Sequence, residues 1–169
     1  SKDMEAGEEP PLMTIQARDG RSIPLAVGIC FEAAYPLVIG DGVARGGQVI
    51  VVPSNNYHFR SSGESAQQGQ LLRMRAMEYS RSAVQASTTG HSYVIRPDGT
   101  ILASTGTEEA ATLAADIPLR TSQTLTALAG ERIPGAVMVV TLIIAILTTA
   151  TVIGQGIRAS ARVRRASGH

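Results

Sequence analysis

An uncharged stretch near the carboxyl end restricts what this chain can fold into more than any other feature. Residues 133–157 read IPGAVMVVTLIIAILTTATVIGQGI, 25 residues without one Asp, Glu, Lys or Arg. About 20 residues of α-helix suffice to cross the hydrocarbon core of a bilayer. A buried helix of a soluble protein is usually shorter, and a surface helix keeps a polar face. We therefore predict a single transmembrane helix over 133–157.

The charges that flank this helix predict its orientation. Four arginines and no acidic residue follow it: Arg158, Arg162, Arg164 and Arg165. Only Glu131 and Arg132 lie close on the other side. Because positively charged residues stay on the cytoplasmic side, residues 158–169 are predicted to be a cytoplasmic basic tail. Everything before residue 131 is then expected outside the cytoplasm. A tail that binds RNA would show aromatic or Gly-rich interleaving, which this one lacks.

Composition and charge limit the class of partner. The formal net charge is +1, and the arginines are dispersed until the basic tail. A nucleic-acid-binding surface needs a concentrated basic patch, so we expect no nucleic-acid partner. Residues 1–11, SKDMEAGEEPP, are acidic and end in proline, and they are predicted to be a flexible lead-in without an initiator methionine or a signal peptide. The chain is therefore expected to be a fragment of a longer protein.

Alternating apolar and polar patterns predict an α/β domain. LMTIQAR (12–18) and IPLAVGI (23–29) alternate around Asp19-Gly20 and form a predicted hairpin. QVIVVPS (48–54) is a continuous apolar run, typical of a strand buried on both faces. Helices are expected over 33–44 and 66–83, and further strands over 84–89, 91–96 and 100–105. In the helix over 66–83, we expect Leu71, Met74 and Met77 toward a core, with Leu72 in second place.

The only cysteine, Cys30, follows the second predicted strand and comes directly before Phe31 and Glu32. Ligands of open α/β sheets collect at the carboxyl ends of the strands. A helix that begins there would stabilise a thiolate, the form of cysteine that attacks carbonyl groups. From the residues alone, Cys30 is either a nucleophile with Glu32 as a partner or a small core residue.

Three segments in order resemble one known superfamily. ICFEAAYP is similar to the Cys-aromatic-Glu signature of the nitrilase, or carbon–nitrogen hydrolase, superfamily. VIVVPSNNYHF resembles the superfamily's strand and Ser-Asn-rich loop, and QLLRMRAMEYSRSAVQASTTGHSYVIRPDGTIL resembles the helix, strand and hairpin that follow. With the transmembrane helix and the arginine tail, the chain resembles the membrane-bound branch, the apolipoprotein N-acyltransferases, over about residues 12–165.

This resemblance implies a fold and its boundaries. Residues 12–118 would be the C-terminal half of a nitrilase-like domain, part of an α-β-β-α sandwich. Residues 119–132 would connect that domain to the transmembrane helix. The protein would lie in a bacterial plasma membrane, with the nitrilase-like domain outside the cytoplasm and the carboxyl terminus inside.

The resemblance also implies a reaction and its partners. The cysteine takes an acyl chain from a membrane phospholipid as a thioester and passes it to the N-terminal amine of a diacylglyceryl-cysteine lipoprotein. The implied residues are Cys30 as nucleophile and Glu32 in support. The residues expected to bind substrate are Phe31, Asn55, Asn56 and His58. No cofactor is expected, and no metal site, since His91 lacks a partner at ligand spacing.

Two catalytic residues of the superfamily have no match in this sequence. Its members use a Glu as general base and a Lys that stabilises the oxyanion, both before the Cys. The only lysine here is Lys2, in an acidic context, and Glu5, Glu8 and Glu9 lie on no predicted strand. The chain alone is therefore predicted to be inactive. Two alternatives stay open: a nitrilase-type amidase that acts on a small C–N substrate, and a non-catalytic membrane-anchored module.

Overall fold

The computed structural model describes residues 7–59, 62–130 and 132–166. Its chain divides into two units, residues 1–130 and residues 131–169. Lys2 and Glu5 lie outside the described residues. The first unit contains all the strands of the described chain, and the second is a single long helix.

Six strands of the first unit form one mixed sheet in the order of the sequence. They are β1 (Leu12–Gln16), β2 (Ser22–Val27), β3 (Val49–Ser54), β4 (Ser82–Ser87), β5 (Tyr93–Ile95) and β6 (Ile101–Ser104). β1 and β2 form the predicted hairpin, with Leu12 opposite Ala26 and Gln16 opposite Ser22. β3 runs parallel to both β2 and β4, and β5 and β6 complete an antiparallel edge. The carboxyl ends of β2, β3 and β4 therefore meet at one edge of the sheet.

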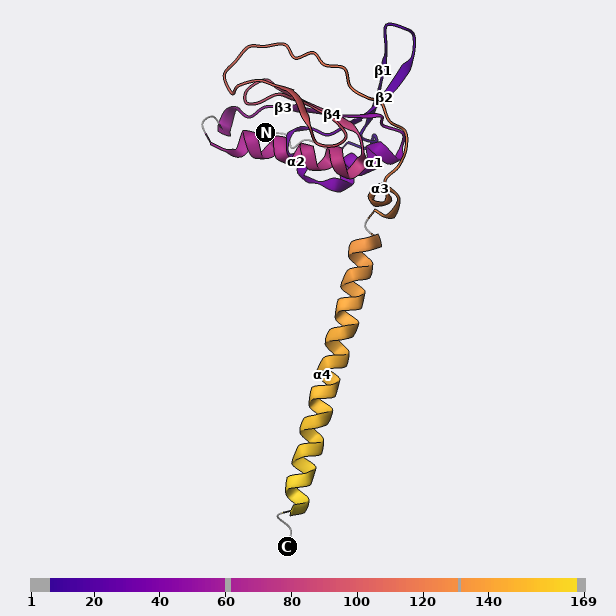
Figure 1. Cartoon of the computed structure of the whole chain (residues 1–169), viewed down its shortest axis with the longest axis vertical. Coiled ribbons are helices and arrows are strands. Elements are labelled where there is room, and N and C mark those ends of the chain that lie inside the picture. The colour runs from indigo at the N-terminus through magenta and orange to yellow at the C-terminus, as the bar shows by residue number, and fades with distance from the viewer. Residues whose placement is uncertain (1–6, 60–61, 131, 167–169) are drawn as a thin grey trace. The chain divides into compact units, whose positions relative to one another are not determined.

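Two helices, α1 (Pro36–Ala44) and α2 (Glu64–Tyr79), pack against this sheet from one side. The shorter helices of the first unit are η1 (Cys30–Ala34), η2 (Tyr57–Phe59) and α3 (Leu125–Ala129). Figure 1 shows α1 and α2 on the same side of the sheet. The described residues thus contain one helical layer and one sheet, which are two of the four layers of the expected α-β-β-α sandwich.

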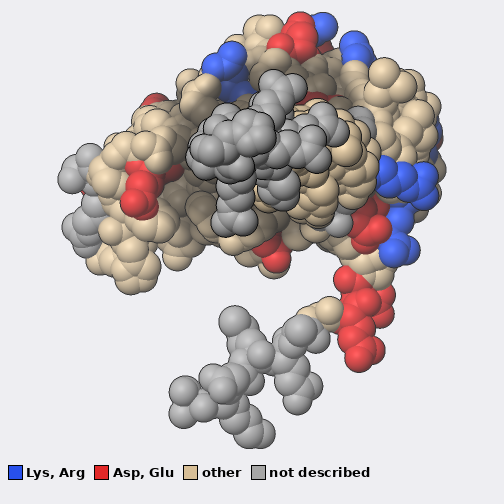
Figure 2. All heavy atoms as spheres, turned by 90° about the horizontal axis from the view of Figure 1, so that it is seen from below, with Lys and Arg blue, Asp and Glu red and all other residues tan. Residues whose placement is uncertain are grey.

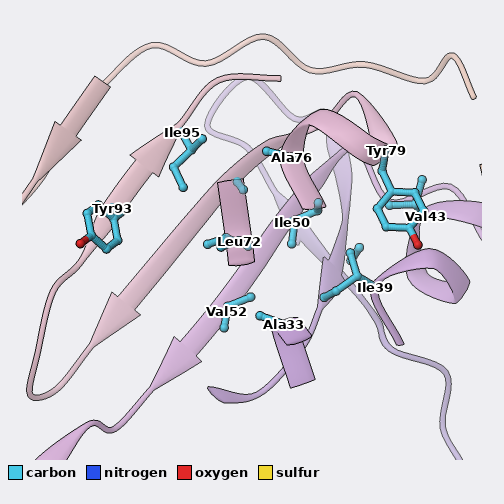
Figure 3. Close-up of a cluster of buried hydrophobic side chains, with 12 residues drawn as sticks. Ala33, Ile39, Val43, Ile50, Val52, Leu72, Ala76, Tyr79, Tyr93 and Ile95 are labelled. Atoms are coloured by element: carbon cyan, nitrogen blue, oxygen red, sulfur yellow. The ribbon is translucent and has the colours of Figure 1, made fainter. Parts of the chain in front are cut away.

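The hydrophobic core lies between the sheet and these two helices. Ile50 and Val52 of β3 face Leu72 of α2 and Ile39 of α1, and all four side chains are buried (Figure 3). β3 is buried on most of its length, as its continuous apolar sequence predicts. This central strand fixes the position of the chain segments that leave the neighbouring strand ends.

The helix predicted over 66–83 differs from the observed α2 in its end and in its buried face. It ends at Tyr79 because Ser80 adopts a left-handed conformation (φ 51°), and residues 82–83 join β4. Met74 and Met77 are about half exposed, so their expected place in the core is wrong, whereas Leu72 is fully buried. The buried face of α2 instead consists of Ser65, Gln68, Gly69, Leu72, Arg75, Ala76 and Tyr79.

Small residues let this face approach the sheet closely. A Cβ added to Gly69 would overlap the ring of Tyr93, so only glycine leaves room for that ring. The whole face follows the spacing of three and four residues expected for one side of a helix. Part of its surface is polar, and this part is the one that reaches the candidate site.

The segment between β6 and α3 has no regular secondary structure and is held by side chains near the end of α2 (Figure 1). Arg81, which is buried, donates from Nε to the carbonyl of Gly47 (2.8 Å) and from Nη1 to that of Ser122 (2.6 Å). Ser82 Oγ donates to the carbonyl of Pro118 (2.8 Å). Burial, and then the charge of Arg120, lower the pKa of Arg81.

The second unit is α4 (Arg132–Ala166). Its segment Gly135–Gly154 has 20 residues, a mean hydropathy of 2.6 and no buried part. Thr141 and Thr148 donate their hydroxyls to the carbonyls of Val137 (2.8 Å) and Ile144 (2.9 Å), so these polar groups are satisfied within the helix. By length and composition, α4 can cross a bilayer once, as the sequence predicts.

Candidate active site

Cys30 occupies a strained turn at the carboxyl end of β2. It is the first residue of η1, its thiol is free, and its side chain is half-buried. Its φ of 52° lies in the left-handed region, which non-glycine residues rarely adopt. Such strain persists where the surrounding structure enforces it, and it gathers at functional positions. The turn presents the sulfur at the sheet edge where ligands of α/β proteins bind.

Glu32 braces this turn. Its Oε2 accepts a hydrogen bond from the N–H of Ile29 (2.7 Å), while its own N–H donates to the carbonyl of Ile29 (3.0 Å). The carboxylate therefore holds the residue directly before Cys30. Glu32 also lines a cleft of about 680 Å³ together with Pro10, Ile29 and Leu37. These contacts hold the backbone of the turn, and a supporting role of Glu32 in the reaction stays a prediction.

Gln68 of α2 reaches the sulfur, and sequence reasoning missed it. Its Nε2 lies 3.6 Å from Cys30 Sγ, within the range of a hydrogen bond to sulfur, and the residue is buried. The three- and four-residue spacing of the buried positions of α2 carried the signal. A search for large apolar side chains passes over a face that is built from Ser, Gln and Gly.

The two asparagines after β3 have different environments. Asn56 is buried and donates from Nδ2 to Gln68 Oε1 (2.9 Å), so it connects to Cys30 through Gln68. Asn55 is exposed, and its Oδ1 accepts from the N–H of Tyr57 (3.1 Å) in a turn. The structure thus brings Asn56 into the surroundings of the thiol and places Asn55 on the surface loop.

Phe31 and His58 are exposed aromatic side chains of two loops. Phe31, next to the thiol in sequence, is 62% exposed and packs edge-to-face on Tyr35 (5.9 Å between ring centroids). His58 lies in η2, and its ring is 5.7 Å from that of Tyr57 in a similar arrangement. Both are accessible to a ligand, and their role in binding stays a prediction.

Charges of the first unit are dispersed. Arg side chains and Asp and Glu side chains are scattered among uncharged residues over the face shown in Figure 2. Glu8 and Glu9 are exposed and precede β1. Within the described ranges, no group of three or more His, Cys, Asp or Glu could hold a metal ion.

Comparison with known proteins identifies relatives of one kind. The model of the carbon–nitrogen hydrolase family matches residues 3–127. An apolipoprotein N-acyltransferase of Mycolicibacterium smegmatis is 38% identical over 102 residues, which are 60% of this chain and 17% of the relative. The enzyme of the same name from Rhodopseudomonas palustris is 36% identical over 124 residues, 73% of this chain and 23% of the relative. The chain thus spans about a fifth of the length of these curated relatives.

A solved structure supports the fold. Nit3 of Saccharomyces cerevisiae, described as a member of branch 10 of the nitrilase superfamily, superposes with a TM-score of 0.51 at 25% identity. The match covers 63% of this chain and 40% of Nit3. The nitrilase-like fold expected from the sequence is therefore confirmed.

Proposed function

The chain belongs to the carbon–nitrogen hydrolase family, and from that premise we propose that it supplies the nucleophile of a bacterial apolipoprotein N-acyltransferase. The observation that carries this proposal is the presence, in one chain, of a strained Cys30 turn and a helix apolar enough to cross a bilayer. The relatives named as N-acyltransferases support the same function. A spanning helix would anchor the domain that carries the thiol to the membrane that contains the lipidic substrates.

The proposed reaction has two steps that pass through Cys30. A general base takes the proton of the Cys30 thiol, the thiolate attacks an ester carbonyl of a phospholipid, and the ester C–O bond breaks. The lysophospholipid leaves with the proton that the base held. The acyl chain is then a thioester on Sγ. The N-terminal amine of a diacylglyceryl-cysteine lipoprotein attacks this thioester, the C–S bond breaks, and the amine proton returns the cysteine to its starting state. Division into two steps is what covalent catalysis provides, and a thiolate is a good leaving group for the second.

Residues outside this chain are proposed to provide the general base and the oxyanion lysine. The curated relatives are several times longer than this chain, and the only lysine here is Lys2. Cys30 is proposed as the nucleophile and Glu32 as its supporting residue. Phe31, Asn55 and His58 are proposed to line the substrate site with Asn56 behind them.

The topology is proposed from the charges that flank α4. Residues 12–118 form the nitrilase-like domain outside the cytoplasm, 119–132 connect it to the span 133–157, and residues 158–169 lie inside. A cysteine-reactive, membrane-impermeant reagent tests this on intact cells in a Cys30→Ser background. A cysteine at Ser122 should be labelled and one at Ser167 should not; the reverse pattern would contradict the orientation.

The test of the reaction uses the full protein in which this chain occurs, in membranes that contain a phospholipid with a labelled acyl chain. Mass spectrometry should find the acyl group on the peptide that contains Cys30, and hydroxylamine should remove it. The Cys30→Ser variant should carry no hydroxylamine-labile adduct. A folded, inserted protein without the adduct would refute the acyltransferase. Release of ammonia from a small amide would instead identify an amidase.

A further inference from the structure

We propose that Gln68 is a positioning residue for the Cys30 thiolate and that Asn56 sets the direction of its amide. The inference rests on the proposed function, because it treats Cys30 as a nucleophile. Three buried polar side chains from two parts of the chain carry it. Gln68 and Ser65 come from α2, and Asn56 comes from the loop after β3.

The amide of Gln68 contacts the sulfur of Cys30. Gln68 Nε2 lies 3.6 Å from Cys30 Sγ, and Gln68 is only 6% exposed. An amide N–H at this position can donate to a thiolate. A buried amide rarely lies without partners, because an unpaired polar group in the interior is costly. The sulfur is therefore one of the partners that satisfy the Gln68 side chain.

Asn56 determines which way the Gln68 amide points. Asn56 Nδ2 donates to Gln68 Oε1 over 2.9 Å, and Asn56 is 2% exposed. Because Asn56 presents a donor, the oxygen of Gln68 turns toward it and the NH₂ group turns toward Cys30. Rotation of the Gln68 amide alone would place two donors against each other. Asn56 thus selects the orientation that suits a thiolate.

Asn56 is itself held in place by neighbouring residues. Its backbone N–H donates to the carbonyl of Thr89 (3.1 Å), and its Nδ2 also lies 3.4 Å from Ser65 Oγ. Ser65 Oγ accepts from the backbone N–H of His91 (2.9 Å). A Cβ added to Gly90 would come within 2.5 Å of Ser65 Oγ, so the 89–91 loop lies tightly against this pair. The Asn56–Gln68 pair is therefore held by α2, by the loop after β3 and by the loop after β4.

The consequence concerns the reactivity of the thiol. A hydrogen bond to the charged form of a group favours that form, and the thiolate is the nucleophile. Glu32 accepts from the backbone N–H of Ile29, the residue before Cys30, whereas Gln68 contacts the Cys30 sulfur itself. The two residues thus position different parts of the same turn, and only Gln68 acts on the sulfur directly.

The experiment follows alkylation of the chain by iodoacetamide as a function of pH, with mass spectrometry as the readout. Cys30 is the only cysteine of the chain, so the label has one site. Gln68→Met keeps the volume and removes the amide. Asn56→Asp replaces the donor that directs the amide by acceptors. Gln67→Met and Gln67→Glu are the matched controls, since Gln67 is an exposed neighbour of Gln68 and can carry both kinds of change.

Gln68→Met should be alkylated about tenfold more slowly at pH 7, because hydrogen bonds to charged groups are the stronger ones. The pH of half-maximal rate should move upward, and Asn56→Asp should behave in the same direction. Both controls should match the unaltered chain. Unfolding would expose the thiol and speed its alkylation, so it cannot imitate this result. If Gln68→Met unfolds, as circular dichroism would show, Asn56→Asp decides.

A rate and a pH profile equal to those of the unaltered chain, in a folded Gln68→Met or Asn56→Asp variant, would overturn the inference. Its failure is separable from that of the proposed function. Slow alkylation of the variants without an acyl adduct in the full protein would leave a positioned thiol that is not an acyltransferase nucleophile. An adduct with unchanged alkylation would leave the function and remove the role of Gln68.

Discussion

Two long helices of this molecule, α2 and α4, meet different surroundings and show it in opposite patterns. α2 buries a narrow stripe of small, polar and apolar residues and exposes Met74 and Met77. α4 is apolar on all sides over Gly135–Gly154 and buries none of it. A sheet requires close fit along one side of a helix, whereas a bilayer requires only apolar surface on every side. Apolar content therefore says little about burial until the partner of the helix is known.

The largest expected effect comes from a cavity in the buried stripe of α2. Leu72→Ala should lower the free energy of unfolding by about 2–5 kcal/mol, because Leu72 is fully buried and its removal leaves a void. Urea unfolding of the chain in detergent micelles, followed by near-ultraviolet circular dichroism, measures it. The matched variant Leu142→Ala, at a 60% exposed position of α4, should leave this transition unchanged. Equal losses would contradict the distinction.

The second prediction places the same charge on both helices. Ile144→Arg should disfavour membrane insertion of α4 by about 2.5–3.5 kcal/mol, the cost of an arginine at the centre of a spanning helix. The fraction of chain that resists alkaline extraction from membranes measures this loss. Met74→Arg, on the exposed side of α2, should be extracted like the unaltered chain. Loss of extraction resistance in Met74→Arg but not in Ile144→Arg would contradict the prediction, because α2 and not α4 would then contact the membrane.

The third prediction concerns the end of α2 and has a pH dependence. The hydroxyl of Tyr79 donates to the carbonyl of Pro36 (2.7 Å), so Tyr79→Phe should cost about 1 kcal/mol. Burial, and then the charge of Glu78, raise the pKa of Tyr79. The folded state holds this proton more firmly than the unfolded state. The stabilisation is therefore complete below about pH 10 and is lost as the pH rises further.

Denaturant midpoints measured between neutral and strongly alkaline pH check this effect. In Tyr79→Phe the alkaline loss should be smaller than in the unaltered chain. Part of it should remain, because burial also raises the pKa of Tyr93. An identical alkaline limb in both proteins would show that Tyr79 does not contribute to it.

The smallest expected effect concerns the exposed side of α2. Met74→Ala should change the free energy of unfolding by less than about 0.5 kcal/mol, since exposed positions away from special features usually stay in that range. The same urea titration measures it. A loss as large as that of Leu72→Ala would mean that the first unit buries Met74 in solution.

The predictable part of this molecule is the part written in local patterns. The hairpin of β1 and β2, the buried β3 and the apolar α4 each follow from a run or an alternation of residues. The position of Cys30 after β2 followed in the same way, since one strand end fixes it. These features depend on residues close together in the sequence.

The missed part depends on contacts between distant segments. Ser80 ends α2 in a left-handed conformation that the sequence would signal only if a glycine stood there. Gly69 leaves room for the ring of Tyr93 from β5. Gln68 looks like a surface residue until Asn56 and Cys30, from two other segments, become its neighbours. A buried polar or small residue gains its place from its partners, and a single sequence does not show which partners those are.

The buried Arg81 has a mechanical consequence. Any pull that reaches the chain from α4 passes through α3 to the segment held by Arg81, Ser82 and Thr124. Arg81 and Ser82 donate hydrogen bonds to the carbonyls of Ser122 and Pro118, respectively. The Thr124 hydroxyl donates to the carbonyl of Glu78 (2.7 Å). These bonds join the segment to the end of α2 and the start of β4, whereas Gln68 lies three turns earlier in the helix. A load applied to the chain beyond α3 therefore acts first on these hydrogen bonds at the carboxyl end of α2, while Gln68 lies near the opposite end of that helix.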